Sequence, residues 1–312
     1  MSVTNKKGQK LDLIKKMLLC SLLLSLLAGF SRAQAGRRAS GVSAEDSGLT
    51  LPVVAVREKN ASEMVKAENL AFYENGVEQR IKSFAFDPTP SRIVILVDNS
   101  QTLRTDVAKM QDAAKEFAYE IYDGDQLFFA AYDEKPEIIQ EWTDDAKKIE
   151  KSLATFRKKG NPFLFDALDA ILEQVLRPLM PGTSKTAVVI ISDGLDRGSK
   201  INFDRILADL QQANVPVYTL QIPDRTGGAF RCDQPKPEQT IEKLTEGTGG
   251  RVFDFNDPQA AAKAICDELR KNRYLLSYQS LNASSLDARR LFLTGDEGIS
   301  LRLKSMQPPS AR

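Results

Sequence analysis

The stretch Ile93-Val94-Ile95-Leu96-Val97, followed at once by Asp98-Asn99-Ser100-Gln101-Thr102, decides the fold of this chain. An uninterrupted apolar run rich in β-branched residues is typical of a strand buried on both faces of a parallel sheet. Asp98 then lies at the carboxyl end of that strand, where open α/β sheets place their ligand sites. One carboxylate and the hydroxyls of Ser100 and Thr102 form an oxygen cluster that suits a hard cation such as Mg²⁺.

A second apolar run, Thr186–Ile191, is predicted as another strand and leads into Ser192-Asp193-Gly194. Because the carboxyl ends of parallel strands meet at one edge of a sheet, we expect Asp193 near Asp98. Two structural interpretations compete with a metal site. Asp and Ser after a buried strand often cap the next helix, and Asp-Gly is common in turns.

From Arg92 onward, predicted strands and helices alternate along the chain, which is the pattern of a doubly wound, mostly parallel α/β sheet with helices on both faces. We assign residues 90–272 to this domain. Its helices include one predicted from Leu164 to Leu176 and another over 237–246, which ends at Gly247 and Gly249-Gly250 as suitable left-handed terminators.

The segments on either side of this domain are predicted to be short strands. Residues 50–88 contain an Asn75-Gly76 hairpin turn, and residues 273–305 again have an extended pattern. We expect these two segments to pack together as a small β unit. Residues 36–49 are expected to be flexible, and the tail 306–312, with its two prolines, to be disordered.

The first 35 residues have the pattern of a secretory signal peptide. Five lysines precede an apolar stretch from Met17 to Phe30, and Ala33-Gln34-Ala35 offers a small-residue site with cleavage after Ala35. The stretch is short for a bilayer span, although an uncleaved anchor is the alternative. We therefore expect a secreted or periplasmic protein without a stable membrane span after cleavage.

Charge and residue usage exclude several classes of function. Without residues 1–35, which hold six of the 43 basic and one of the 42 acidic residues, the chain has 37 basic against 41 acidic residues. This mildly acidic balance gives no electrostatic case for general nucleic-acid binding. The chain has no histidine, which removes Ser-His-Asp and Cys-His catalysis, and its cysteines are too few for a zinc-thiolate site. Cys232 and Cys266 permit one disulfide, which the sequence leaves open.

The two strand-end motifs, in this order, resemble the von Willebrand factor type A (VWFA) domain, in which these segments form the metal-ion-dependent adhesion site (MIDAS). The resemblance covers about residues 90–270. Glu68–Val77 and Gly249–Phe253 resemble flanking segments of a bacterial, secreted group of such proteins. The resemblance implies that Asp98, Ser100 and Thr102 are ligands of Mg²⁺, or of Mn²⁺ or Ca²⁺. It also implies that Asp193 binds the ion directly or through water.

The second loop of the family's metal site, which corresponds here to the residues just before Leu164, departs from the family pattern. The family has a threonine a few residues before a Leu-aromatic-Asp-Ala segment, here Leu164–Ala167, and alignment on that segment puts Pro162 at the threonine position. Proline offers no side-chain oxygen, so Asn161 or water would have to replace that ligand. Mg²⁺ keeps several waters readily, so the departure permits either a weakened site or no metal at all.

Three charged residues near these loops are expected to have no ligand role. We interpret Asp166 as a local cap or structural hydrogen-bonding group, because it lies within the apolar stretch of a helix. Asp196 and Arg197 are expected to be solvated loop residues, with a position bordering a ligand face as the alternative.

The resemblance implies a non-enzymatic adhesion module, whose metal keeps an open position for the Asp or Glu carboxylate of a protein partner. A metal-independent scaffold or interaction protein of the cell envelope is the alternative. A Mg²⁺-dependent phosphoryl-transfer enzyme is disfavoured, because Ser100 stands where an aspartyl-phosphate site of this kind needs a second acid, and no general base is evident.

Overall fold

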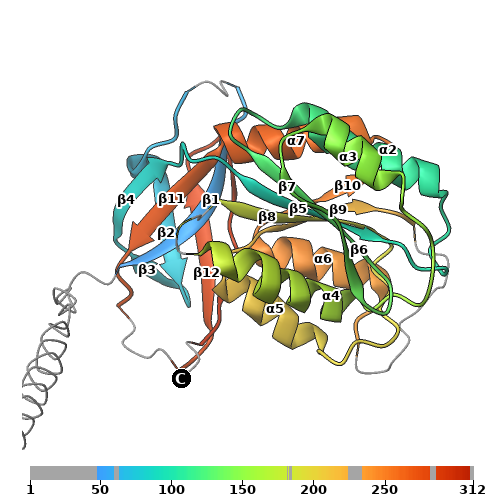
Figure 1. The fold of residues 1–312 in the computed structure, drawn as a ribbon. Helices are drawn as coiled ribbons and strands as arrows, with labels where there is room; N and C mark the ends of the chain where they lie inside the picture. Colours follow the sequence, from blue (N-terminus) through green and yellow to red (C-terminus); the bar gives the residue numbers. More distant parts are fainter. Residues whose placement is uncertain are drawn as a thin grey trace, which may run out of the picture. The chain divides into compact units, whose positions relative to one another are not determined.

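The computed structural model of the protein describes residues 48–59, 63–180, 182, 185–223, 234–281 and 286–309. Its centre is a six-stranded sheet in which β5 lies between β8 and β6 (Figure 1). The order is β10-β9-β8-β5-β6-β7, with bounds β5 Arg92–Asp98, β6 Gln126–Tyr132, β7 Pro136–Thr143, β8 Thr186–Ser192, β9 Val217–Gln221 and β10 Val252–Asp254. Neighbouring strands are parallel except β6 and β7, which are antiparallel. The predicted fold class is confirmed.

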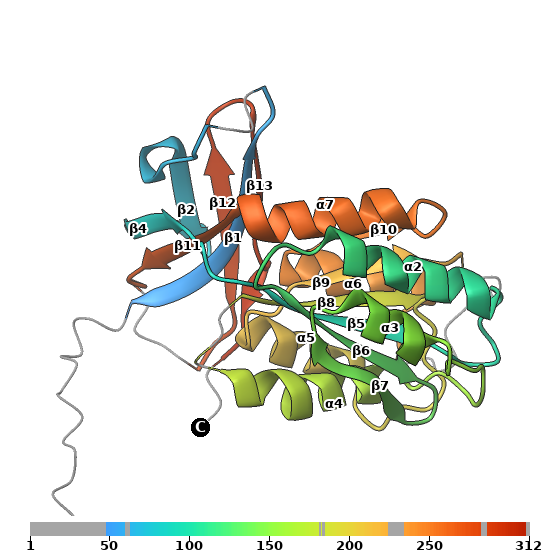
Figure 2. The same cartoon turned by 45° about the horizontal axis from the view of Figure 1, so that its top comes forward.

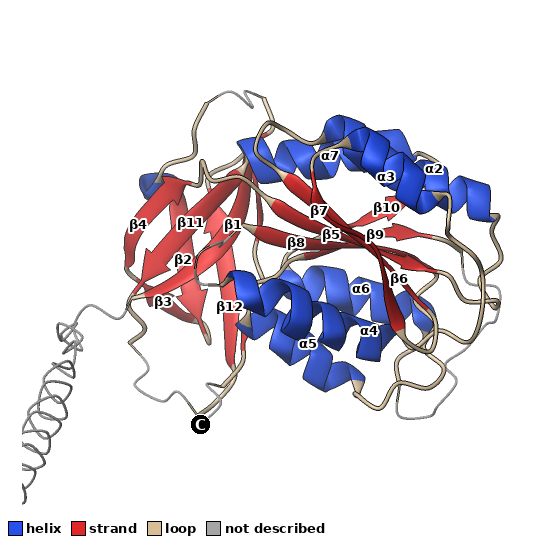
Figure 3. Ribbon diagram, in the orientation of Figure 1, coloured by secondary structure: helices blue, strands red, loops and turns tan. Residues whose placement is uncertain are grey.

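Helices cover both faces of this sheet (Figure 3). Their bounds are α2 Val107–Glu120, α3 Ala146–Leu153, α4 Leu164–Ala170, α5 Phe203–Gln212, α6 Pro237–Thr248 and α7 Pro258–Lys271. On β5, Ile93, Ile95 and Val97 pack in one core with α2, α3 and α7. Val94 and Leu96 pack in a second core with α4, α5 and α6. Both faces of β5 are therefore buried, which is why its apolar run shows no alternation.

Two four-stranded sheets form a second β unit, with orders β13-β1-β11-β4 and β14-β12-β2-β3 (Figure 2). The elements are β1 Leu49–Arg57, the short 3₁₀ helix η1 Ala67–Asn69, β2 Leu70–Glu74, β3 Val77–Gln79, β4 Ile81–Phe86, β11 Arg273–Tyr278, β12 Arg289–Gly295, β13 Ile299–Arg302 and β14 Met306–Gln307. Antiparallel pairing joins β1 to β11 and β2 to β12. A shared core includes Phe72, Leu276 and Leu293. The segments before and after the α/β region thus build one unit.

The β2–β3 hairpin turns at Asn75 and Gly76, whose φ angles are 51° and 81°. Both residues occupy the left-handed region that a two-residue hairpin turn requires, and Asn and Gly adopt it at the lowest cost. The hairpin predicted from this dipeptide is confirmed.

Two helices differ from their predicted form. The helix predicted over 237–246 continues to Thr248, and of the predicted glycine terminators it is Gly249, with φ of 86°, that takes the left-handed conformation. The helix predicted from Leu164 is α-helical as far as Ala170 and then takes wider π-helical turns in η2, Ile171–Leu176, before the 3₁₀ turn η3, Arg177–Leu179. Apolar spacing does not separate a π turn from an α turn, so the sequence could not show this change.

Residues 306–309 of the C-terminal tail are ordered where we expected disorder. Met306 and Gln307 form β14 and pair with Arg290 and Arg289 of β12. The backbone N–H of Ser305 also donates to the carbonyl of Gly247 at 3.0 Å. These bonds come from partners distant in sequence, which local composition cannot reveal.

Several predictions lie outside the described residues: the signal peptide, residues 36–47 of the segment after it, and Cys232. Cys266, the other cysteine of the possible pair, is buried on α7. Within the described ranges, no helix has the length and apolar character needed to cross a membrane.

Candidate functional site

The candidate site begins at Asp98, the last residue of β5, whose side chain is fully buried. Its Oδ1 accepts the backbone N–H of Ser100 at 2.9 Å. Its Oδ2 accepts the hydroxyl of Ser192, the last residue of β8, at 3.0 Å. The carboxyl ends of the neighbouring strands β5 and β8 therefore meet at this carboxylate, as the sequence predicted.

Tyr132, the last residue of β6, is a member of this group that sequence reasoning missed. It stands opposite Asp98 in the ladder, and its hydroxyl lies 3.2 Å from Asp98 Oδ2 and 2.9 Å from Ser192 Oγ. Burial, followed by the charge of Asp98, raises the pKa of Tyr132 well above its ordinary value, so the hydroxyl stays protonated and can donate. The sequence signal that could have identified Tyr132 is its position at the end of β6, because β6 ends at the same sheet edge as β5 and β8.

The two predicted hydroxyl ligands lie together beside Asp98. Ser100 is fully buried, Thr102 is half-buried, and their hydroxyl oxygens are 3.1 Å apart. Burial raises the pKa of Asp98, while hydrogen bonds from Ser100, Ser192 and Tyr132 oppose that rise. No ion pair links Asp98 to a basic residue in the described part of the chain. The Asp98 carboxylate is thus buried, and no basic side chain among the described residues forms an ion pair with it.

Asp193 lies at the same edge, and its side chain also stabilises a turn. Its Oδ1 accepts the backbone N–H of Leu195 at 3.0 Å, and Gly194 between them has φ of 82°. The turn interpretation therefore holds for one carboxylate oxygen. The negative charge of Asp193 also contributes to the raised pKa of Tyr132, which places Asp193 in the electrostatic surroundings of the buried group.

The second loop contributes no side-chain oxygen at the expected position. Pro162 is buried, and its carbonyl accepts the backbone N–H of Arg197 at 2.8 Å. Asn161, the possible replacement, is exposed and donates its amide to Glu134 Oε1 at 3.3 Å. The hydrogen bond of Asn161 thus uses its amide nitrogen, and Glu134 rather than the Asp98 cluster is its partner.

Asp196 was expected to be solvated, and that expectation is wrong. Its side chain is 4% exposed and accepts the backbone N–H groups of Phe165 at 3.2 Å and Ser199 at 3.2 Å, and the hydroxyl of Ser199. Arg197 beside it is half-buried rather than fully solvated. The Asp196 carboxylate joins the start of α4 to the loop after β8, a contact between distant segments.

Asp166 is a structural hydrogen-bonding group, as predicted. Its Oδ1 accepts the backbone N–H groups of Lys200 and Ile201, each at 2.9 Å. It thereby anchors the same loop to α4.

The oxygen donors at this edge are of the type that a hard cation prefers, but few of them are charged. A carboxylate and two hydroxyls of the first loop are oxygen donors, the type that Mg²⁺ prefers. The residues described contain no group of three or more His, Cys, Asp and Glu side chains that could hold a metal. A cation here would therefore depend on Ser100 and Thr102 beside Asp98, with Asp193 as a further carboxylate.

The family model described as von Willebrand factor type A domain matches residues 93–267, which is more than half of the chain. The chain therefore belongs to this family. VWFA domains generally mediate protein–protein interactions and are typically not enzymes.

Among solved structures, the chain is similar to a von Willebrand factor type A protein from Catenulispora acidiphila at 10% identity, with a TM-score of 0.48 over 84% of this chain and 74% of that one. It is also similar to an aerotolerance-related membrane protein from Bacteroides fragilis, at 16% identity and a TM-score of 0.46 over 58% of this chain and 99% of that one. A conserved hypothetical protein BatB from Bacteroides thetaiotaomicron is 16% identical, with a TM-score of 0.42 over 58% of this chain and 98% of that one. The curated proteins contain no match.

Proposed function

We propose that this chain is a non-enzymatic protein-binding module that holds a divalent cation at the carboxyl edge of its sheet and uses it to bind a carboxylate-bearing partner. The observation that carries the proposal is the buried Asp98, which has two hydroxyls beside it and no basic partner in the described residues. Burying a carboxylate without a counter-charge is costly, and a bound cation would remove much of that cost.

The roles of the residues follow from their hydrogen bonds. Ser192 and Tyr132 donate to Asp98 Oδ2, and the Ser100 backbone donates to Oδ1, so the carboxylate is held in one orientation. A carboxylate has about four lone-pair directions, and the Ser100 hydroxyl also bonds to Asp98, so a metal contact would take the place of that hydroxyl bond. Asp98, Ser100 and Thr102 would hold the ion, and Asp193 would bind it directly or through water.

Mg²⁺ is the expected ion, with Mn²⁺ or Ca²⁺ as substitutes, because all the donors are oxygens. A cation held by few protein charges stays electrophilic and attracts an outside carboxylate. The Asp or Glu side chain of a protein partner is the ligand that fits this chemistry.

A metal-independent interaction protein of the cell envelope is the second candidate, and the second loop favours it. Pro162 supplies no side-chain oxygen, and Asn161 is hydrogen-bonded to Glu134. Under this alternative, the same edge would bind a partner through its loops without a cation.

We further propose that the chain acts outside the cytoplasm, either secreted or in the periplasm, after cleavage following Ala35. The lysine-rich start, the short apolar stretch and the Ala33-Gln34-Ala35 site support this location.

Isothermal titration calorimetry of Mg²⁺ and Mn²⁺ into the chelator-treated chain, prepared without residues 1–35, tests the metal site. We expect saturable binding that is at least about tenfold weaker in Asp98→Asn, because an amide removes the ligand charge but keeps the side-chain shape. Asp106→Asn is the matched control, since Asp106 is an exposed carboxylate on the same connection between β5 and α2.

Circular dichroism would establish that each variant is folded. Absence of binding in the folded unsubstituted chain would refute the metal site and support the metal-independent alternative. Equal binding in Asp98→Asn and the unsubstituted chain would show that the ion binds elsewhere.

A further inference from the structure

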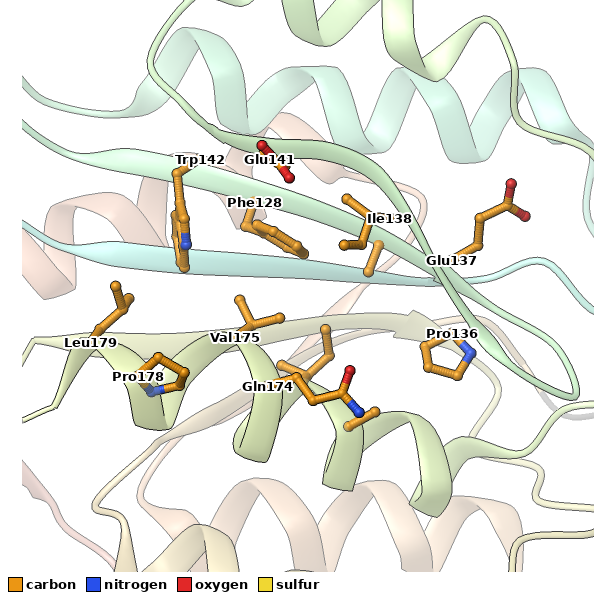
Figure 4. Close-up of a pocket in the computed structure, with 13 residues that line it drawn as sticks. Phe128, Pro136, Glu137, Ile138, Glu141, Trp142, Gln174, Val175, Pro178 and Leu179 are labelled. Carbon is orange, nitrogen blue, oxygen red and sulfur yellow. The ribbon is translucent and has the colours of Figure 1, made fainter.

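A groove with a volume of about 610 Å³ runs between the β6–β7 hairpin and the helical segment α4–η2–η3 (Figure 4). Side chains of β6 and β7 form one wall, and Gln174, Val175, Pro178 and Leu179 lie on the other. At the N-terminal end of β7, Pro136 pairs with Tyr132, so the groove reaches the sheet edge that holds the candidate metal site. It involves none of the proposed metal ligands.

The groove is apolar and partly open to solvent. Ile138 of β7 is 58% exposed, which is unusual for a β-branched apolar side chain. Trp142 is half-buried and packs against Phe128 with their ring centroids 5.3 Å apart. An aromatic floor beside an exposed aliphatic side chain is the type of surface that anchors an apolar side chain of a partner.

The opposite wall contains the π-helical segment η2. A π turn is wider than an α turn, and such turns occur frequently at functional sites. Gln174 and Val175 of this segment line the groove, so the irregular part of the helix faces it. Part of the π-helical segment therefore faces the groove, while Leu172 and Leu176 of the same segment pack in the core.

The charges that line the groove have one sign. Among the described lining residues, Glu137 and Glu141 are the only ionisable ones, and both lie on the β7 side (Figure 4). Glu137 pairs with Lys159, which is exposed, at 2.7 Å. Glu141 is exposed and makes no ion pair within the described part of the chain. An occupant with positive charge next to its apolar part is therefore electrostatically favoured.

We propose that this groove is a second, metal-independent interaction site that takes a protein segment carrying a large apolar side chain next to Lys or Arg. The apolar side chain lies between Trp142, Ile138 and Val175, and the cation faces Glu141. A protein segment is favoured over a small ligand because β7 is an edge strand whose one strand partner among the described residues is β6, and an edge strand can pair with the backbone of a partner chain.

The probe for the test is the synthetic peptide Ac-Lys-Leu-Lys-Phe-Lys-amide, with Ac-Glu-Leu-Glu-Phe-Glu-amide as its acidic counterpart and cyclohexanol as a small apolar ligand. Trp142 is the only tryptophan of the chain, so its fluorescence reports on the groove directly. The titration uses the chain without residues 1–35 in excess chelator, which separates this proposal from the metal site. We expect a saturable change with the basic peptide, at concentrations up to ~1 mM, and at least about tenfold weaker binding of the acidic one.

Two variants locate the binding. Ile138→Ser removes the apolar contact without adding a charge, and we expect it to weaken binding of the basic peptide at least about tenfold; Glu141→Lys is expected to reverse the preference between the peptides. Phe292→Ser is the matched control, because Phe292 is 63% exposed on β12 and is not a lining residue of the groove. Ile138 and Glu141 are both exposed, so neither change puts the fold at risk.

Three results would overturn the proposal: no saturable change with the basic peptide, equal binding in Ile138→Ser, or a change with cyclohexanol and neither peptide. The last result would assign the groove to a small apolar ligand. Failure of this test leaves the calorimetric test of the metal site unaffected, because the chelator excludes the ion throughout.

Discussion

Replacement of Lys304 by methionine is predicted to change how the stability of this protein depends on pH. Lys304 follows β13 and is 2% exposed. Its ammonium group donates to the carbonyl of Gln211 at 2.7 Å, Asn214 Oδ1 at 2.6 Å and Gln307 Oε1 at 2.6 Å. All three acceptors are neutral, so no carboxylate among them offsets the buried charge. Burial, with a smaller contribution from the charge of Arg289, lowers the pKa of Lys304 to about 7.

The sign follows from proton binding in the two states. In the unfolded chain the pKa of Lys304 is 10.5, so between pH 7 and 10.5 the unfolded state holds a proton that the folded state has released. The free energy of unfolding therefore rises with pH across this window. The stability that Lys304 contributes through its deprotonation is lost as the pH falls through 7. At about 1.4 kcal/mol per pH unit, the rise from pH 7 to pH 9 is about 3 kcal/mol, and the whole window gives about 5 kcal/mol as an upper bound.

Urea unfolding at pH 6, 7, 8 and 9 measures this effect. The unsubstituted chain is expected to gain stability relative to Lys304→Met as the pH rises above 7, because methionine does not titrate. Lys243→Met on α6 is the matched control, since Lys243 is exposed, and it should follow the unsubstituted chain at every pH. If the curves of Lys304→Met and the unsubstituted chain run parallel from pH 6 to 9, the buried lysine does not titrate in this range and the reasoning is wrong.

Three further predictions concern the loops and turns around the sheet. Gly250→Ala should destabilise the protein by about 3 kcal/mol or more in urea unfolding, because the added Cβ would lie 1.9 Å from a backbone oxygen of β9. Gly76→Ala is the comparison: with φ of 81° and no atom within 4 Å of the added Cβ, it should lower the free energy of unfolding by only about 1 kcal/mol. Equal losses in the two variants would contradict this prediction. Asp166→Ala should cost about 1–2 kcal/mol, because two backbone N–H groups held at 2.9 Å lose their acceptor; an unchanged thermal midpoint would argue against it. Pro162→Thr should tighten Mg²⁺ binding about tenfold in calorimetry by restoring a hydroxyl, and an unaltered affinity would refute the placement of this residue at the second loop's ligand position.

The first-loop part of the candidate site could be predicted because it depends on short-range rules. An apolar run that is buried on both faces ends at Asp98, and the edge of a parallel sheet gathers the residues that follow such strands. The same rule could have included Tyr132, which ends β6. It was missed because a tyrosine at the end of an apolar run is equally compatible with a core residue, and only the strand register puts its hydroxyl beside Asp98.

The sequence alone determined the class of fold, the sheet edge that holds the candidate site and the hairpin at Asn75-Gly76, because hydrophobic periodicity, strand-end polarity and turn residues act over a few neighbouring positions. Only the tertiary structure decided the burial of Asp196, the pairing of β14 with β12 and the π-helical wall of the groove. Each of these depends on backbone groups or packing supplied by segments distant in the chain. Their free energies arise only when those segments meet, so no local pattern in the sequence records them.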